Sequence, residues 1–100
     1  MQGLKAAWRE RAFKQEVVIL VIVAPLGWWL GETPVEQIML IGSWVLVIIM
    51  ELLNSAIEAA VDRSGLETHE LAGRAKDMGS AAVLCAIILA VFVWGMLIFG

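Results

Sequence analysis

The sequence is poor in charged residues, cysteine and proline. Charged residues make up 17% of its 100 positions, against about 25% in soluble domains. The one cysteine, Cys85, excludes an internal disulfide and a site built from several thiolates. No Pro-rich, Gly/Ser-rich or repeated segment divides the chain, and no basic cluster typical of nucleic-acid binding is present. We therefore expect a single domain over residues 1–100 and no nucleic-acid partner.

Apolar residues are present in excess. They account for 61% of the chain, and the mean hydropathy is +0.87. A soluble domain of this size would bury only about 60–65% of the surface that its unfolded chain exposes. Large apolar patches would then remain in contact with water. The composition therefore predicts a membrane protein.

Three segments are long and apolar enough to form membrane-spanning helices: residues about 15–31, 34–62 and 73–100. The last contains Ala81–Gly100, about twenty residues without a charge, which matches a hydrocarbon core of about 30 Å. The start of the second segment is marked by Thr33, Pro34 and Glu36, which have the pattern of an N-cap, a first-turn proline and a capping box. The expected fold class is an all-α membrane protein with three transmembrane helices.

The distribution of basic residues predicts the orientation of these spans. Four basic residues precede the first span and three lie between the second and the third: Lys5, Arg9, Arg11, Lys14, Arg63, Arg74 and Lys76. The connection between the first two spans carries none. By the positive-inside rule, we expect the N-terminus to face the cytoplasm and the C-terminus to face outward.

A further helix is expected before the spans, over residues about 1–14. One face of such a helix would carry the apolar residues Leu4, Ala7, Trp8 and Ala12. Basic side chains would point elsewhere, which is typical of an amphipathic helix that lies on the membrane surface. The alternative is a basic flank that only sets the orientation.

The most informative segment is the second half of the second span. Its polar residues recur at helical spacing, so one narrow stripe would carry Glu51, Asn54, Glu58 and Asp62. An acidic residue within a span costs about 2.5–3.5 kcal/mol and usually marks a reactive site or a pathway. Because one helix cannot hide this stripe, we expect self-association. The alternative is a solvated extension of the helix, with its acids paired to Arg63, Arg74 or Lys76.

The start of the third span supplies a complementary set of residues. Lys76, Asp77 and Ser80 lie within its first turns, and Gly79 permits close approach of another helix. Carboxylates for Mg²⁺, a lysine for phosphate and one acid as a base are the minimum parts of a phosphoryl-transfer site. The common phosphate-loop and dinucleotide-binding signatures are absent. The residues therefore favour phosphoryl transfer at a membrane surface, with a snorkelling interfacial Lys76 as the alternative.

Two runs of sequence resemble the signature of the prokaryotic diacylglycerol kinases: ELLNSAIEAAVDR at Glu51–Arg63 and HELAGRAKDMGSAAVL at His69–Leu84. The segments GLKAAW and AFKQE near the N-terminus are also similar to that family. The resemblance implies a homotrimer of three-span subunits in the bacterial inner membrane, each with a surface helix. It also implies transfer of the γ-phosphate of MgATP to the hydroxyl of diacylglycerol, which gives phosphatidate.

The resemblance further implies roles for individual residues. Glu51 matches the proposed catalytic base, with Asn54 expected to orient it. Glu10 and Glu58 match ligands of Mg²⁺. Contacts to the nucleotide are implied for Glu10, Glu58, Glu67, Thr68, His69, Lys76 and Asp77. The lipid substrate is implied to lie beside Trp8, Ala12, Phe13, Lys14, Gln15, Glu16, Trp29, Leu30, Gly31, Glu32, Glu51 and Ser80. The chain is shorter than the family pattern between Trp8 and Phe13, so Glu10 is aligned from the AFKQE side.

Other functions stay open at this point. An undecaprenol kinase of the same family would share the scaffold and phosphorylate a polyprenol. A small proton-coupled transporter would also carry an intramembrane glutamate, although such transporters usually have more spans and have no need of a Lys–Asp pair. A purely structural membrane subunit is the third alternative.

Overall fold

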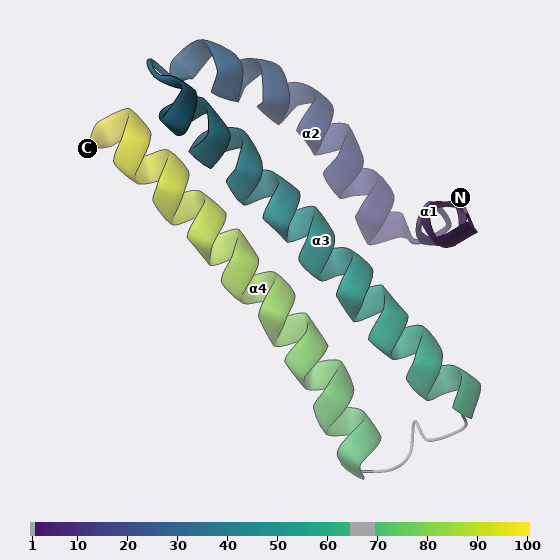
Figure 1. Cartoon of the computed structure of the whole chain (residues 1–100). Coiled ribbons are helices and arrows are strands. Elements are labelled where there is room, and N and C mark those ends of the chain that lie inside the picture. The colour runs from purple at the N-terminus through teal and green to yellow at the C-terminus, as the bar shows by residue number, and fades with distance from the viewer. Residues whose placement is uncertain (1, 65–69) are drawn as a thin grey trace.

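The computed structural model describes residues 2–64 and 70–100, and every regular element in these ranges is an α-helix. The four helices are α1 (Gln2–Ala7), α2 (Arg11–Leu30), α3 (Pro34–Ser64) and α4 (Glu70–Phe99) (Figure 1). The two described ranges contain no strand. The expected all-α class is therefore confirmed.

The three long helices lie side by side in a single layer. α3 is in the middle and contacts both α2 and α4 (Figure 1). The Cα trace measures 49 × 28 × 17 Å. Among the described residues the remaining helix, α1, has only 6 residues, which is too short to form a second layer. Both broad faces of the layer are therefore uncovered in a single chain.

α2, α3 and α4 are all long and apolar enough to cross a membrane. At most 33% of the apolar window of any of them is buried inside the chain. Large apolar side chains such as Val21 and Phe92 are instead 70% and 62% exposed. Exposed surface of this kind is unfavourable in water and favourable in the interior of a bilayer. The fold is thus that of a helical membrane protein.

The helices differ in length, and the difference defines one end of the layer. α2 has 20 residues, about 30 Å, whereas α3 and α4 have 31 and 30 residues, about 45 Å each. α3 and α4 extend beyond the start of α2 (Figure 1). They also run further than the sequence predicts, since α3 continues to Ser64 and α4 begins at Glu70. The outer half of the acidic stripe lies on this projecting end.

The connection between α2 and α3 is fixed by the residues that the sequence marks as a helix start. The backbone N–H of Glu36 donates to Thr33 Oγ1 at 3.2 Å, and the Thr33 hydroxyl donates to Glu36 Oε2 at 3.4 Å. The Gln37 side-chain amide donates to the Trp28 carbonyl at 2.8 Å and ties α3 back to the end of α2. The predicted start of the helix at Pro34 is confirmed.

The N-terminal segment departs from the single surface helix predicted over residues 1–14. α1 ends at Ala7, and the chain turns through Trp8–Glu10 before α2 begins. Ala7 and Phe13 are both buried in one cluster with Ile48 of α3. In one straight helix these two residues would point about 120° apart, so the chain has to turn between them to bury both. The first span therefore starts earlier than predicted, and α1 is a short separate helix beside its start (Figure 1).

Two small apolar clusters hold α3 to its neighbours. One consists of Ala7, Phe13 and Ile48, and the other of Val47, Ala86 and Ala90. The side chain of Trp44 packs against both clusters. Its indole Nε1–H donates to the backbone carbonyl of Glu16 on α2 at 2.9 Å. On the other side, the Trp94 indole of α4 donates to the Leu40 carbonyl of α3, also at 2.9 Å. An indole hydrogen bond thus ties each flanking helix to α3.

Candidate functional site

The acidic stripe of α3 passes from buried to exposed along the helix. Glu51 and Asn54 are each only 8% exposed. Glu58 is half-buried, and the Asp62 carboxylate on the projecting end is 56% exposed. The alternative of a solvated helix extension therefore describes Asp62 but not Glu51. The inner half of the stripe faces the interior of the protein.

Four carboxylates come together around the inner half of the stripe. Glu51 interacts electrostatically with Glu58 on its own helix and with Glu10 in the turn before α2. Glu16, near the start of α2, interacts with Glu51. Like charges that interact in this way repel one another. Such an arrangement is typical of a site that binds a cation or handles a proton.

Two buried side-chain oxygens in this region have no hydrogen-bond partner among the described residues: Glu16 Oε2 and Asn54 Oδ1. The other end of the Asn54 amide, Nδ2, donates to Glu58 Oε1 at 3.3 Å. The sequence led us to expect that Asn54 orients Glu51, whereas this hydrogen bond holds Glu58. Unpaired buried acceptors cost free energy, and in native proteins they are often found at functional sites.

α4 approaches the carboxylates through Gly79, which is buried. A Cβ placed on Gly79 would overlap the side-chain oxygen of Asn54 and would lie 3.5 Å from Ile57 Cδ1. The backbone of α4 is thus in contact with the side chain that holds Glu58. Sequence reasoning identified Gly79 only as a position that permits close packing. The hydrogen bond of Trp44 could not be predicted, because no local pattern links this residue to a partner 28 residues away.

A cation reaches the outer end of the stripe from α4. Lys76 Nζ forms an ion pair with Asp62 Oδ1 at 2.7 Å, and the Lys76 side chain is 33% exposed. Asp77 and Ser80 are exposed on α4. Within one chain, Lys76 is therefore in contact with the stripe, whereas Asp77 and Ser80 are exposed and lie away from it. Three further predicted residues, Glu67, Thr68 and His69, lie outside the described residues.

Apart from Glu51 on α3 and Ser80 on α4, the residues implied to contact lipid fall into two groups at opposite ends of α2. Trp8 and residues 12–16 lie at its start, beside the carboxylates, and residues 29–32 lie at its far end. At 1.5 Å per residue the two groups are about 20 Å apart. Phe13 and Gly31 are buried within the chain, so the Phe13 ring packs against α3 and does not face lipid.

Glu10 and Glu58 fit the metal role that the resemblance implies. In the described ranges, no three His, Cys, Asp or Glu side chains are grouped so as to hold a metal ion by themselves. Mg²⁺ commonly takes one or two protein carboxylates and completes its shell with water and substrate phosphates. Glu10 and Glu58 both interact with Glu51. This pair of oxygen donors suits a Mg²⁺ ion that arrives with a nucleotide.

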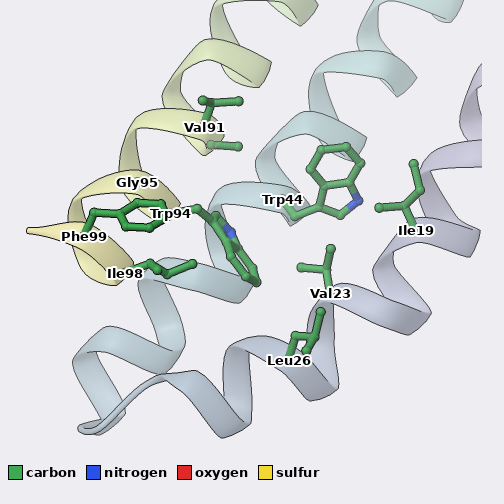
Figure 2. Close-up of a pocket in the computed structure, with 10 residues that line it drawn as sticks. Ile19, Val23, Leu26, Trp44, Val91, Trp94, Gly95, Ile98 and Phe99 are labelled. Carbon is green, nitrogen blue, oxygen red and sulfur yellow. The ribbon is translucent and has the colours of Figure 1, made fainter.

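Two of the cavities among the described residues lie at different heights in the layer. One of about 260 Å³ lies beside Glu10 and is lined by mostly small residues of α1 and α3: Gly3, Ala6, Ala7, Leu52, Ser55, Ala56 and Ala59. The other, of about 390 Å³, is apolar and lies between α2 and α4 next to Trp44 and Trp94 (Figure 2). None of the four carboxylates lines the second cavity. Of these two, the first is therefore the one that opens beside a carboxylate, that of Glu10.

A layer of membrane-spanning helices, with the buried carboxylate of Glu51 and a lysine near one end, is the architecture of an integral membrane protein with a candidate site near that end. The sequence profile of one family, described as prokaryotic diacylglycerol kinase, matches residues 1–98. The chain belongs to this family.

Curated relatives of the chain carry the name diacylglycerol kinase. The relative from Escherichia coli (strain K12) is 54% identical over 100 residues, which cover 99% of this chain and 82% of the relative. The relative from Haemophilus influenzae is 51% identical, and the aligned residues cover 99% of this chain and 85% of the relative. The relative from Pseudomonas aeruginosa is 43% identical, and the aligned residues cover 100% of this chain and 82% of the relative. Bacterial relatives and three apolar helices together indicate an inner-membrane protein of a lipid kinase family.

Proposed function

We propose that this chain is an ATP-dependent diacylglycerol kinase, which transfers the γ-phosphate of MgATP to the free hydroxyl of membrane diacylglycerol and forms phosphatidate. The observation that carries the proposal is the buried Glu51 within a cluster of four carboxylates. The 54% identity to a curated diacylglycerol kinase supports it. Because phosphatidate is a phospholipid precursor, the reaction would return diacylglycerol to phospholipid synthesis.

Glu51 is the general base of the proposed reaction. It takes the proton of the diacylglycerol hydroxyl while the hydroxyl oxygen attacks the γ-phosphorus. The bond between that phosphorus and the β,γ-bridging oxygen breaks, and ADP leaves. Glu51 is buried in a span, where a lipid hydroxyl has better access than bulk water. Most of the rate enhancement in phosphoryl transfer comes from such positioning and from electrostatic stabilisation.

The nucleotide site of the proposal lies on the projecting end of α3 and α4. Glu10 and Glu58 would hold Mg²⁺, which when bound neutralises charge on the phosphate oxygens. Lys76 would exchange its partner Asp62 for the nucleotide phosphates, since the ion pair already holds its ammonium group at the stripe. Asp77 and the segment Glu67, Thr68 and His69 would complete the nucleotide contacts.

The proposed active unit is a homotrimer with a cytoplasmic N-terminus and a periplasmic C-terminus. A layer of 17 Å thickness with two uncovered faces supports association with further copies. The carboxylates lie near the end of the layer that carries the basic residues, which the positive-inside rule assigns to the cytoplasm, where ATP is available. Asp77 and Ser80, exposed in one chain, would face a site completed by a neighbouring copy.

The test of the proposal is phosphate transfer from radiolabelled ATP in mixed micelles with Mg²⁺, with diacylglycerol and undecaprenol offered in parallel. Label in phosphatidate is the expected result. Label in the polyprenol alone would assign the chain to the undecaprenol kinase activity. No label in either lipid from a folded oligomer would overturn the kinase proposal and return attention to the proton-coupled transporter, which family membership disfavours.

The Glu58→Gln variant is expected to need at least about tenfold more Mg²⁺ for half-maximal transfer. The neutral amide is a weaker ligand for a hard cation, whereas it keeps a carbonyl that can accept the hydrogen bond from Asn54. The measurement is transfer rate against free Mg²⁺ concentration. Glu70→Gln is the control, because Glu70 is an exposed acid at the same end of the layer, paired with Arg74 at 3.1 Å. A loss that is the same at every Mg²⁺ concentration would remove Glu58 from the metal site.

A further inference from the structure

Trp44 connects the middle of α3 to the part of α2 that carries Glu16. Its indole Nε1–H donates to the Glu16 carbonyl at 2.9 Å. Within a helix that carbonyl also accepts a backbone hydrogen bond, so the indole uses its second lone pair. The Trp44 ring packs against the apolar clusters on both sides of α3. The ring is therefore fixed in place, and the indole hydrogen bond sets the position of the α2 backbone against it.

Glu16 is the carboxylate that most needs such support. Its Oε2 atom is buried and has no hydrogen-bond partner among the described residues, and it is repelled by Glu51. The surroundings of the Glu16 side chain therefore do little to fix the position of its carboxylate. Glu16 lies in the second turn of α2, six residues after the turn at Trp8–Glu10 ends. Because helix ends fray, the height and rotation of this first part of α2 decide where the Glu16 carboxylate lies relative to Glu51.

We propose that Trp44 is a positioning residue, which holds the start of α2 so that the Glu16 carboxylate stays opposite Glu51. It acts through the backbone of Glu16 and touches no reacting atom. The inference rests on the proposed kinase function. Loss of the indole N–H, with an aromatic ring retained, would loosen the start of α2 and misplace one wall of the site. We therefore expect a lower kcat with little change in the KM for ATP, because Glu16 is not among the residues assigned to the nucleotide.

The chain offers a matched control in Trp94. Its indole makes the same kind of hydrogen bond, to the Leu40 carbonyl at 2.9 Å, and also ties a flanking helix to α3. Both indoles lie beside the apolar cavity, with Trp44 between Trp94 and Ile19 of α2 (Figure 2). The Trp94 bond, however, ends on Leu40, which is eleven residues from Glu51 along α3. Loss of this bond should affect packing without moving Glu16.

The experiment compares Trp44→Phe and Trp94→Phe with the unchanged protein. Each variant is purified in the same detergent, and thermal unfolding, kcat and KM for ATP are measured. Amide hydrogen exchange is followed in peptides that cover residues 11–16. We expect both variants to unfold at similar temperatures. Trp44→Phe alone should lower kcat by roughly tenfold, leave the KM for ATP within about twofold, and speed exchange at the start of α2.

Each other outcome decides against the inference. Equal kcat values for the two variants, with the unchanged protein active, would show that Trp44 serves packing only. A loss confined to the KM for ATP would place its effect at the nucleotide site. Unchanged exchange in residues 11–16 of Trp44→Phe would show that the indole does not hold that segment. If the unchanged protein transfers no phosphate to diacylglycerol, the proposed function fails first and the inference fails with it.

Discussion

Glu51→Gln is expected to lower phosphate transfer to diacylglycerol by roughly 10²–10⁴-fold. The amide has the size of the carboxylate but cannot take the hydroxyl proton. The fold should tolerate the change, because Glu51 is buried among carboxylates that repel it. Removal of one charge relieves that repulsion, so we expect the thermal unfolding temperature to stay the same or to rise. A residue that costs stability and supports activity is common at functional sites.

The measurement for Glu51 is kcat in mixed micelles together with thermal unfolding of the same sample. Glu51→Asp is the informative companion, since it keeps a proton acceptor but withdraws it from the lipid. Activity between those of the unchanged protein and Glu51→Gln would show that proton acceptance and position both matter. If Glu51→Gln instead keeps activity within about twofold of the unchanged protein, a general base cannot reside at this position.

Gly79→Ala is expected to be nearly as damaging, although it adds only one methyl group and changes no charge. The new Cβ would overlap the Asn54 side-chain oxygen and would lie 3.3 Å from Asn54 Cγ. Either α4 retreats from α3 or Asn54 gives up the hydrogen bond that holds Glu58. Overpacking of this kind typically costs about 1–3 kcal/mol of stability. Misplacement of a catalytic group by about 1 Å can cost about 100-fold in rate.

Gly73→Ala provides the control for this prediction. Gly73 lies on the same helix, and a Cβ there would meet nothing within 4 Å. Alanine favours helix over glycine by up to about 1 kcal/mol, so Gly73→Ala should be slightly stabilised and fully active. Rates and unfolding temperatures of the two variants are compared in one preparation. Full activity of Gly79→Ala would show that the contact with Asn54 has no part in shaping the site.

The parts of the fold that follow from the sequence are those set by local chemistry. The start of α3 at Pro34 depends on Thr33 and Glu36, which are its neighbours along the chain. The stripe of Glu51 and Glu58 follows from helical spacing alone. The turn after α1 does not, because it depends on burial of side chains against Ile48, a residue far away in the sequence.

The site could be predicted only in part, for a related physical reason. Helical spacing places residues on one face of α3 but does not say which neighbour covers that face, since apolar residues occur all around the spans. The hydrogen bond from Asn54 to Glu58 competes with the expected one to Glu51, and only the side-chain geometry decides between them. Lys76 was expected to contact phosphate, with pairing to an acid of the stripe as the alternative, and only the structure shows that its partner is Asp62.

The unequal length of the helices has a consequence for how a lipid would be handled. α2 is eleven residues shorter than α3, which leaves a step of about 16 Å at the end of the layer. Glu51 interacts with Glu16, near the foot of that step. A lipid that lies along α2 with its tails in the bilayer would present its head group at this height. In the proposed reaction, the lipid substrate therefore stays in the membrane. The water-soluble nucleotide reaches it along the part of α3 that extends beyond α2.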